Sequence, residues 1–191
     1  MLQIKNLSTI NLINVNFTVE SGQCVCIYGE SGSGKTRLLR AIADLDISQG
    51  EVFIHHSAKS QMPANDWRRQ VTFLPAESHW WRDYVADHFE HFSPDYSSLG
   101  LPSEIGAWRI DRLSTGEKQR LSLLRALNHD PAFLLLDETT ANLDAENTHR
   151  VEVLIKDKLL NGLGVVWVSH SEEQRQRMAD ISYQIQNGQL S

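Results

Sequence analysis

A glycine-rich octapeptide, GESGSGKT at residues 29–36, constrains the fold of this chain more than any other feature. The apolar run CVCIY precedes it, and apolar residues at helical spacing follow it. The pattern G-x-x-x-x-G-K-[ST] between a strand and a helix is typical of a phosphate-binding loop, because its glycines let successive backbone N–H groups point inward. We therefore expect the loop to bind a nucleotide. The residues expected to do so are Gly29, Glu30, Ser31, Gly32, Ser33, Gly34, Lys35 and Thr36.

Two acidic residues end a second apolar run, FLLLDE at residues 133–138. Ligands of open α/β sheets bind at the carboxyl ends of the strands. Asp137 is suited to hold Mg²⁺ together with the Thr36 hydroxyl, and Lys35 supplies a charge for the β- and γ-phosphates. Glu138 can act as the general base for a water aligned with the γ-phosphate. The alternative is a pair of solvated acids at a strand end.

The order of the elements predicts an α/β fold. Strand patterns alternate with helix patterns, which implies a mostly parallel sheet covered on both faces, here the core of a P-loop NTPase. Residues 1–28 have the pattern of short strands that close with the run CVCIY, and we expect an antiparallel β region near the N-terminus. Residues 77–112 are rich in aromatics and histidines, and they predict a small inserted helical subdomain. We expect one domain over residues 1–191, with its core in residues 1–76 and 113–191.

Composition limits where the chain works. Its 18 Lys and Arg against 24 Asp and Glu give 18 − 24 = −6, so we expect no nucleic-acid partner. No apolar run has the roughly 18–20 residues of a membrane span, and the N-terminal segment MLQIKNLSTI lacks the pattern of a signal peptide. We expect a cytoplasmic protein. Cys24 and Cys26 share one face of a strand and are expected in the core.

The stretch LSTGEKQR, residues 113–120, reads as a prepared helix start. Ser114 followed three residues later by Glu117 is a capping-box pattern, and it leaves small residues at a positive helix end where a phosphate could approach. With the phosphate loop upstream and the acidic pair downstream, the chain resembles the ATP-binding cassette (ABC) ATPase family, whose signature reads L-S-G-G-Q. The resemblance also takes in TANLD at residues 140–144 and VVWVSH, which ends at His170.

The resemblance implies a mechanism and partners. His170 matches the switch histidine, expected to contact the γ-phosphate. Two subunits would pair head to tail as a homodimer, so that Ser114 and Gly116 of one hold the γ-phosphate bound by the other, with residues 141–144 at the interface. The implied function is ATP hydrolysis with ATP and Mg²⁺, driving a separate integral membrane permease. The subunit would lie peripherally on the inner face of the cell membrane. The chain is loosely similar to small bacterial iron-export ATPases. The alternative is a non-transport ABC-type ATPase acting on DNA or ribosomes.

The sequence departs from the family pattern at several positions. Thr115 stands at the first signature glycine, Glu117 at the usual glutamine of the signature, and Ala76 at the usual glutamine after the strand QVTFLP. No aromatic precedes Phe17, so the usual adenine-stacking residue is not visible, and Tyr28 is expected in the core.

The inserted segment offers two further candidate features. Trp80, Trp81 and Tyr84 are candidates for permease docking, because aromatics anchor interfaces, or alternatively for the segment's own core. His88 and His91 stand three residues apart, which fits either a metal pair or a solvated or core-lining helix.

Overall fold

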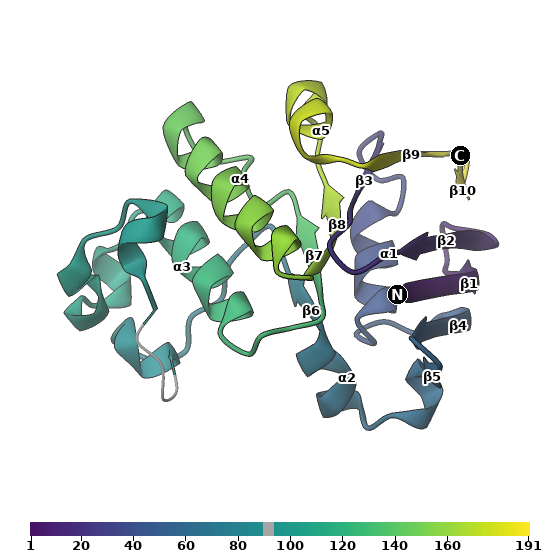
Figure 1. Cartoon of the computed structure of the whole chain (residues 1–191), viewed down its shortest axis with the longest axis horizontal. Coiled ribbons are helices and arrows are strands. Elements are labelled where there is room, and N and C mark those ends of the chain that lie inside the picture. The colour runs from purple at the N-terminus through teal and green to yellow at the C-terminus, as the bar shows by residue number, and fades with distance from the viewer. Residues whose placement is uncertain (90–93) are drawn as a thin grey trace.

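The computed structural model describes residues 1–89 and 94–191, arranged around two β-sheets (Figure 1). The strands are β1 (Leu2–Ser8), β2 (Val15–Val19), β3 (Cys24–Gly29), β4 (Gln49–Ile54), β5 (Ser57–Ala58), β6 (Val71–Leu74), β7 (Phe133–Asp137), β8 (Gly164–Val168), β9 (Ile181–Gln186) and β10 (Gln189–Leu190). The α-helices are α1 (Lys35–Ile42), α2 (Ala64–Gln70), α3 (Thr115–Leu127), α4 (Ala145–Leu160) and α5 (Glu172–Met178).

The larger sheet has the order β10-β9-β3-β8-β7-β6 and is parallel except for β10, which pairs antiparallel with β9. The smaller sheet, β2-β1-β4-β5, is antiparallel throughout. The α/β class, the mostly parallel sheet and the N-terminal antiparallel region predicted from the sequence are confirmed. Because β3, β7 and β8 are neighbours, their carboxyl ends bring residues 29, 137 and 168 to one edge of the sheet.

Side chains of the large sheet alternate between two hydrophobic cores. Val25 and Ile27 of β3 pack toward α1 and the antiparallel sheet, whereas Cys24 and Cys26 pack toward α3 and α4. Figure 1 shows the same layers, with α1 between the two sheets and α3 and α4 on the opposite face. Both cysteines are free and fully buried, as predicted. The hydrogen-bonding contact with Cys26, together with burial, raises the pKa of the Cys24 thiol far above its ordinary value. These cysteines serve packing.

The inserted segment is built from short turns. Its described residues form the 3₁₀ helices Ala86–His88, Tyr96–Leu99, Ser103–Ala107 and Ile110–Arg112, and no α-helix. The turn at residues 96–99 contacts α3 and α4, and Leu99 and Ile105 are fully buried in the second core. The segment therefore covers the outer side of α3 and α4. Among the described residues, none of the helices is both long and apolar enough to cross a bilayer.

Candidate nucleotide-binding and hydrolysis site

The phosphate loop begins at a backbone position that only glycine can occupy. Gly29 ends β3 with φ 151°, and a Cβ there would lie 2.5 Å from the Ile185 carbonyl oxygen of β9. Gly34 has φ 105° and stands at the N-cap of α1, which no side chain caps. The first N–H groups of α1 are therefore open to an anion, as a phosphate site requires.

Lys35 is held inside the loop. Its side chain is 5% exposed, and Nζ donates to the carbonyl oxygens of Gly29 at 2.9 Å and Glu30 at 2.8 Å. Burial lowers the pKa of the Lys35 ammonium, and the carboxylates of Glu138 and Asp137 oppose that shift. Two backbone carbonyl oxygens thus hold the ammonium inside the loop in the folded chain.

Asp137 joins the loop to the end of β7. The Thr36 hydroxyl donates to Asp137 Oδ2 at 2.8 Å, while Oδ1 is buried without a hydrogen-bond partner. Burial raises the pKa of this carboxyl, the Thr36 hydrogen bond opposes the shift, and Glu138 adds to it. A buried carboxylate oxygen without a partner, beside a hydroxyl, is a donor set that fits Mg²⁺, which prefers hard oxygen ligands.

Glu138, which directly follows β7, lies beside His170, which follows β8. Glu138 adopts a left-handed φ of 49°, and its Oε1 lies 2.8 Å from His170 Nε2. Both side chains remain accessible, at 33% and 51% exposed. Left-handed backbone at a non-glycine residue is strained, and here it aims a carboxylate at the histidine two residues past β8.

The phosphate loop borders a cavity of about 810 Å³ that also reaches Glu138. Its wall includes Ser31, Gly32, Gly34, Lys35 and Thr36. Beyond the loop the lining continues to Ile10 and Ile47, which are 84% and 99% exposed. Among the described lining residues no aromatic is present, as the sequence indicated. Tyr28 lies under the Arg175 guanidinium, 4.2 Å from its ring, and Ala76 does not line the cavity as described.

The signature stretch forms a separate, exposed end of the molecule. Ser114 caps α3, and the predicted capping box is present: Glu117 N–H donates to Ser114 Oγ at 3.3 Å, and Ser114 N–H donates to Glu117 Oε2 at 2.8 Å. The Ser114 hydroxyl also lies 2.8 Å from the same carboxylate oxygen. Neither Ser114 nor Gly116 lines the phosphate-loop cavity as described, so the structure does not bring them to Lys35 within one chain.

Comparison with known proteins identifies the family. The family model described as "ABC transporter" matches residues 12–141. The chain belongs to the ABC transporter family. It is 31% identical over 194 residues to the "Probable iron export ATP-binding protein FetA" of Escherichia coli (strain K12), covering 91% of this chain and 86% of that protein. It is 33% identical over 198 residues to the "Aliphatic sulfonates import ATP-binding protein SsuB 1" of Shouchella clausii (strain KSM-K16), covering 98% and 76%.

Solved structures agree on the fold. One, described as "Structure of ATP binding subunit of ABC transporter", superimposes with a TM-score of 0.91 at 21% identity, covering 100% of this chain and 88% of that one. The chain is therefore an ABC ATPase, a nucleotide-binding subunit that binds and hydrolyses ATP. These relatives include both an export and an import protein.

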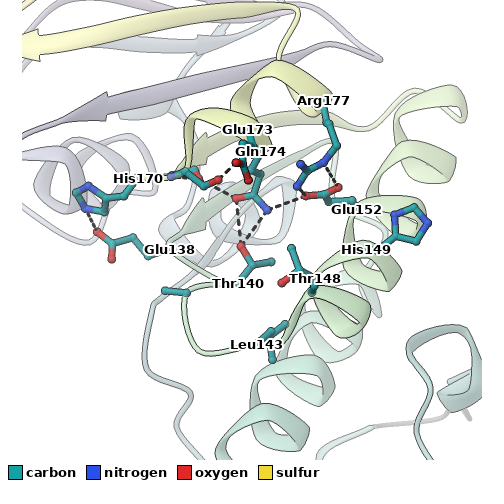
Figure 2. Close-up of a pocket in the computed structure, with 14 residues that line it drawn as sticks. Glu138, Thr140, Leu143, Thr148, His149, Glu152, His170, Glu173, Gln174 and Arg177 are labelled. Atoms are coloured by element: carbon teal, nitrogen blue, oxygen red, sulfur yellow. Dashed lines mark hydrogen bonds and ion pairs between the residues drawn. The ribbon is translucent and has the colours of Figure 1, made fainter.

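A polar network that the sequence did not predict lies next to Glu138 and His170 in this ABC subunit (Figure 2). Gln174 of α5 is 3% exposed and contacts Thr140, Ser169 and Glu152. Arg177 pairs with Glu152 through Nε at 2.9 Å and a second guanidinium nitrogen at 2.7 Å. These residues are scattered over residues 140–177, and α5 has almost no apolar periodicity that would have indicated a buried face.

The aromatics of the inserted segment divide between core and surface. Trp80 packs against the second core, whereas Trp81 is 68% and Tyr84 44% exposed. The rings of both tryptophans meet His88 edge-on, and the Arg125 guanidinium lies over both.

His88 is a core residue rather than a metal ligand. Its Nε2 accepts from the N–H groups of Trp81 and Arg82, its Nδ1 contacts the Tyr84 carbonyl, and burial lowers its pKa. Among the described residues, no three or more His, Cys, Asp or Glu side chains form a group that could hold a metal ion, and His91 lies outside those residues.

Proposed function

We propose that this ABC ATPase works as a head-to-tail homodimer that drives a separate integral membrane permease, from the cytoplasmic face of the membrane. The observation that carries the proposal is the separation of the two half-sites. Lys35, Thr36, Asp137, Glu138 and His170 converge at one end of the parallel sheet. The exposed Ser114 and the half-buried Gly116 lie at the start of α3, and neither lines the phosphate-loop cavity as described. A second copy, turned head to tail, would bring the missing half to each nucleotide.

In the proposed reaction each of these five residues has one task. Lys35 and the open N–H groups of α1 bind the β- and γ-phosphates, and Asp137 with Thr36 would hold Mg²⁺. That ion would supply neutralising charge at the phosphates when bound. Glu138 accepts a proton from the attacking water, and His170 orients that carboxylate through the 2.8 Å contact.

The docking surface proposed for the permease lies on the inserted segment. Trp81 is exposed and lines a groove of about 420 Å³ together with Arg82, Arg125 and His129. Tyr84, three residues further along the chain, is also exposed. Large exposed aromatics are typical anchors of protein interfaces. Trp80, the third candidate, contributes mainly to the fold of the segment.

The test is a Glu138→Gln variant of the full chain with Mg-ATP. We expect ATP binding to remain, kcat to fall by roughly 10²- to 10⁴-fold because a general base is lost, and a dimer to accumulate in sedimentation velocity. Lys35→Met in the same background is the control and should stay monomeric because ATP binding is lost. A strictly monomeric Glu138→Gln chain at saturating Mg-ATP would contradict the head-to-tail dimer.

The same variant tests the partner. Glu138→Gln bait incubated with native membranes and Mg-ATP should retain an integral membrane protein, and Trp81→Ala should weaken that retention without changing ATP binding. Recovery of DNA or ribosomes in place of a membrane protein would favour the non-transport alternative.

A further inference from the structure

Gln174 occupies the space between the loop that carries Glu138 and the loop that carries His170. Among residues 1–89 and 94–191 it is one of the few polar side chains that are almost fully buried, at 3% exposed. Its amide contacts three other polar side chains (Figure 2). One lies on the turn after β7, one on the turn after β8 and one on α4. The proposed function gives Gln174 no role in the binding and hydrolysis of ATP by the residues around the phosphate loop.

On the first side, Gln174 holds the turn after Glu138. The Thr140 hydroxyl lies 3.1 Å from Gln174 Oε1 and 3.0 Å from Nε2. The turn is tight, since Ala141 N–H donates to the Glu138 carbonyl at 3.0 Å and Leu143 N–H donates to the Thr140 carbonyl at 3.1 Å. Fixing Thr140 therefore fixes the backbone that keeps Glu138 at its left-handed φ.

On the second side, Gln174 holds the turn that presents His170. The Ser169 hydroxyl donates to Gln174 Oε1 at 2.8 Å, and Ser171 N–H donates to Ser169 Oγ at 3.2 Å. Gln174 N–H also donates to Ser171 Oγ at 3.2 Å, which caps α5. Both neighbours of His170 in the chain are thus tied to one glutamine.

Glu152 sets which way the amide faces. Gln174 Nε2 donates to Glu152 Oε1 at 3.1 Å, and Arg177 holds the carboxylate from the other side. With the amide reversed, Oε1 would face a carboxylate and the Ser169 hydroxyl would lose its acceptor. The buried Glu152 carboxylate, paired with the half-exposed Arg177, therefore fixes Oε1 toward the two hydroxyls.

We propose that Gln174 is a positioning residue for ATP hydrolysis, holding the Glu138 turn and the His170 turn at the separation that the 2.8 Å contact between them requires. The proposal rests on the roles of Glu138 and His170 under the proposed function. Gln174 itself touches neither side chain in the described structure, so it acts through Thr140 and Ser169.

The first experiment compares Gln174→Met, which keeps the length of the side chain, with Gln176→Met, an exposed position on the same helix. We expect Gln174→Met to lower kcat by roughly tenfold to a hundredfold, as misplacement of reacting groups does, with the ATP dissociation constant within about twofold of wild type because the phosphate loop is untouched. Gln176→Met should leave both unchanged. Wild-type kcat in folded Gln174→Met would overturn the proposal.

A second measurement covers the case in which Gln174→Met does not fold. Thr140→Val and Ser169→Ala each remove one hydroxyl and leave the Glu152–Arg177 pair intact, and each should lower kcat severalfold at an unchanged ATP dissociation constant. In a folded Gln174→Met background either change should add little, since the three residues act as one unit. Full kcat in both single variants would overturn the proposal.

The outcome is separable from that of the proposed function. If wild type hydrolyses ATP and Glu138→Gln does not, the assignment of the base stands whatever Gln174→Met does. If Glu138→Gln hydrolyses ATP at the normal rate, the assignment fails first, and the role of Gln174 fails with it.

Discussion

Two buried carboxylates, Asp137 and Glu152, have opposite environments although both are almost fully enclosed. Asp137 is 4% exposed, burial raises its pKa, and one oxygen has no partner. Glu152 is 2% exposed, and hydrogen bonds from Arg177 and Gln174 outweigh the effect of burial, so its pKa lies below the ordinary value. The comparison teaches that burial alone does not identify a functional acid. The acid whose oxygen lacks a partner, Asp137, is the one that the proposed function assigns to a ligand.

Of the two buried acids, Asp137 should have the larger effect on activity when it is replaced by its amide, Asn. We expect ATP hydrolysis to fall on the order of a hundredfold or more, because a bound divalent cation contributes several kcal/mol of charge stabilisation. The amide oxygen can still accept from Thr36, so the fold should persist. Steady-state ATPase assays across a Mg²⁺ titration measure the loss. Recovery of full activity at high Mg²⁺ would assign Asp137 to affinity alone, and normal activity throughout would remove it from the site.

The same variant predicts an unusual pH dependence of stability. Since folding raises the pKa of Asp137, the folded state binds the proton more tightly than the unfolded state. Wild type therefore loses stability relative to Asp137→Asn as pH rises through the unfolded and then the folded pKa. Without nucleotide, the variant should be at least as stable as wild type at pH 7, and the difference should vanish in acid. Thermal melts at several pH values check the sign.

Replacing Glu152 by Gln should change stability in the opposite direction, so that the variant is less stable than wild type at pH 7. Loss of hydrogen bonds to a charged group predicts a decrease of about 1.5–3 kcal/mol in the free energy of unfolding at pH 7. Because folding lowers the pKa of Glu152, this stabilisation is present above the unfolded value of about 4.3 and is lost as pH falls through the folded value. Urea denaturation of both chains at neutral and acid pH measures the gap. A gap that widens in acid would contradict the pairing with Arg177.

These two acids also differ in whether the sequence alone predicts their positions in the structure. Asp137 was predictable because it ends an uninterrupted apolar strand, and Ser114 with Glu117 because a capping box is complete within four residues. Glu152 was not, since its partners Gln174 and Arg177 are 22 and 25 residues away and only the packing of α5 on α4 unites them.

Two other parts of the chain also lack a local sequence pattern that predicts their structure. Helix α5 was not predicted, because its sequence EEQRQRM buries one methionine and one glutamine and therefore lacks apolar periodicity. The inserted segment, expected to be helical, is helical only as short 3₁₀ turns in its described part, with a turn beginning after Pro102 and another after Asp95, whose carboxylate accepts from Ser97 N–H.

A third carboxylate, Glu117, lies in the first turn of α3. Its replacement should have a smaller effect than replacement of Asp137 or Glu152. In the proposed dimer its charge lies at the end of α3, where a phosphate would approach, and Oε2 is 2.8 Å from the Ser114 hydroxyl. Glu117→Gln keeps an acceptor for the cap and removes the repulsion, which is about 1 kcal/mol for unit charges 4 Å apart in water. We expect dimerisation of the Glu138→Gln chain with Mg-ATP to tighten by roughly fivefold.

Sedimentation equilibrium at low and high salt measures that change, and Glu51→Gln on β4 makes the same change of charge on the antiparallel sheet. Because an exposed charge is screened, the gain from Glu117→Gln should shrink at high ionic strength, whereas Glu51→Gln should give none at either. An unchanged dissociation constant at low salt would show that the carboxylate turns away from the phosphate when the subunits meet. The family's usual glutamine at this position would then reflect capping alone, and the exposed acid would join Glu152 among the carboxylates that serve the fold.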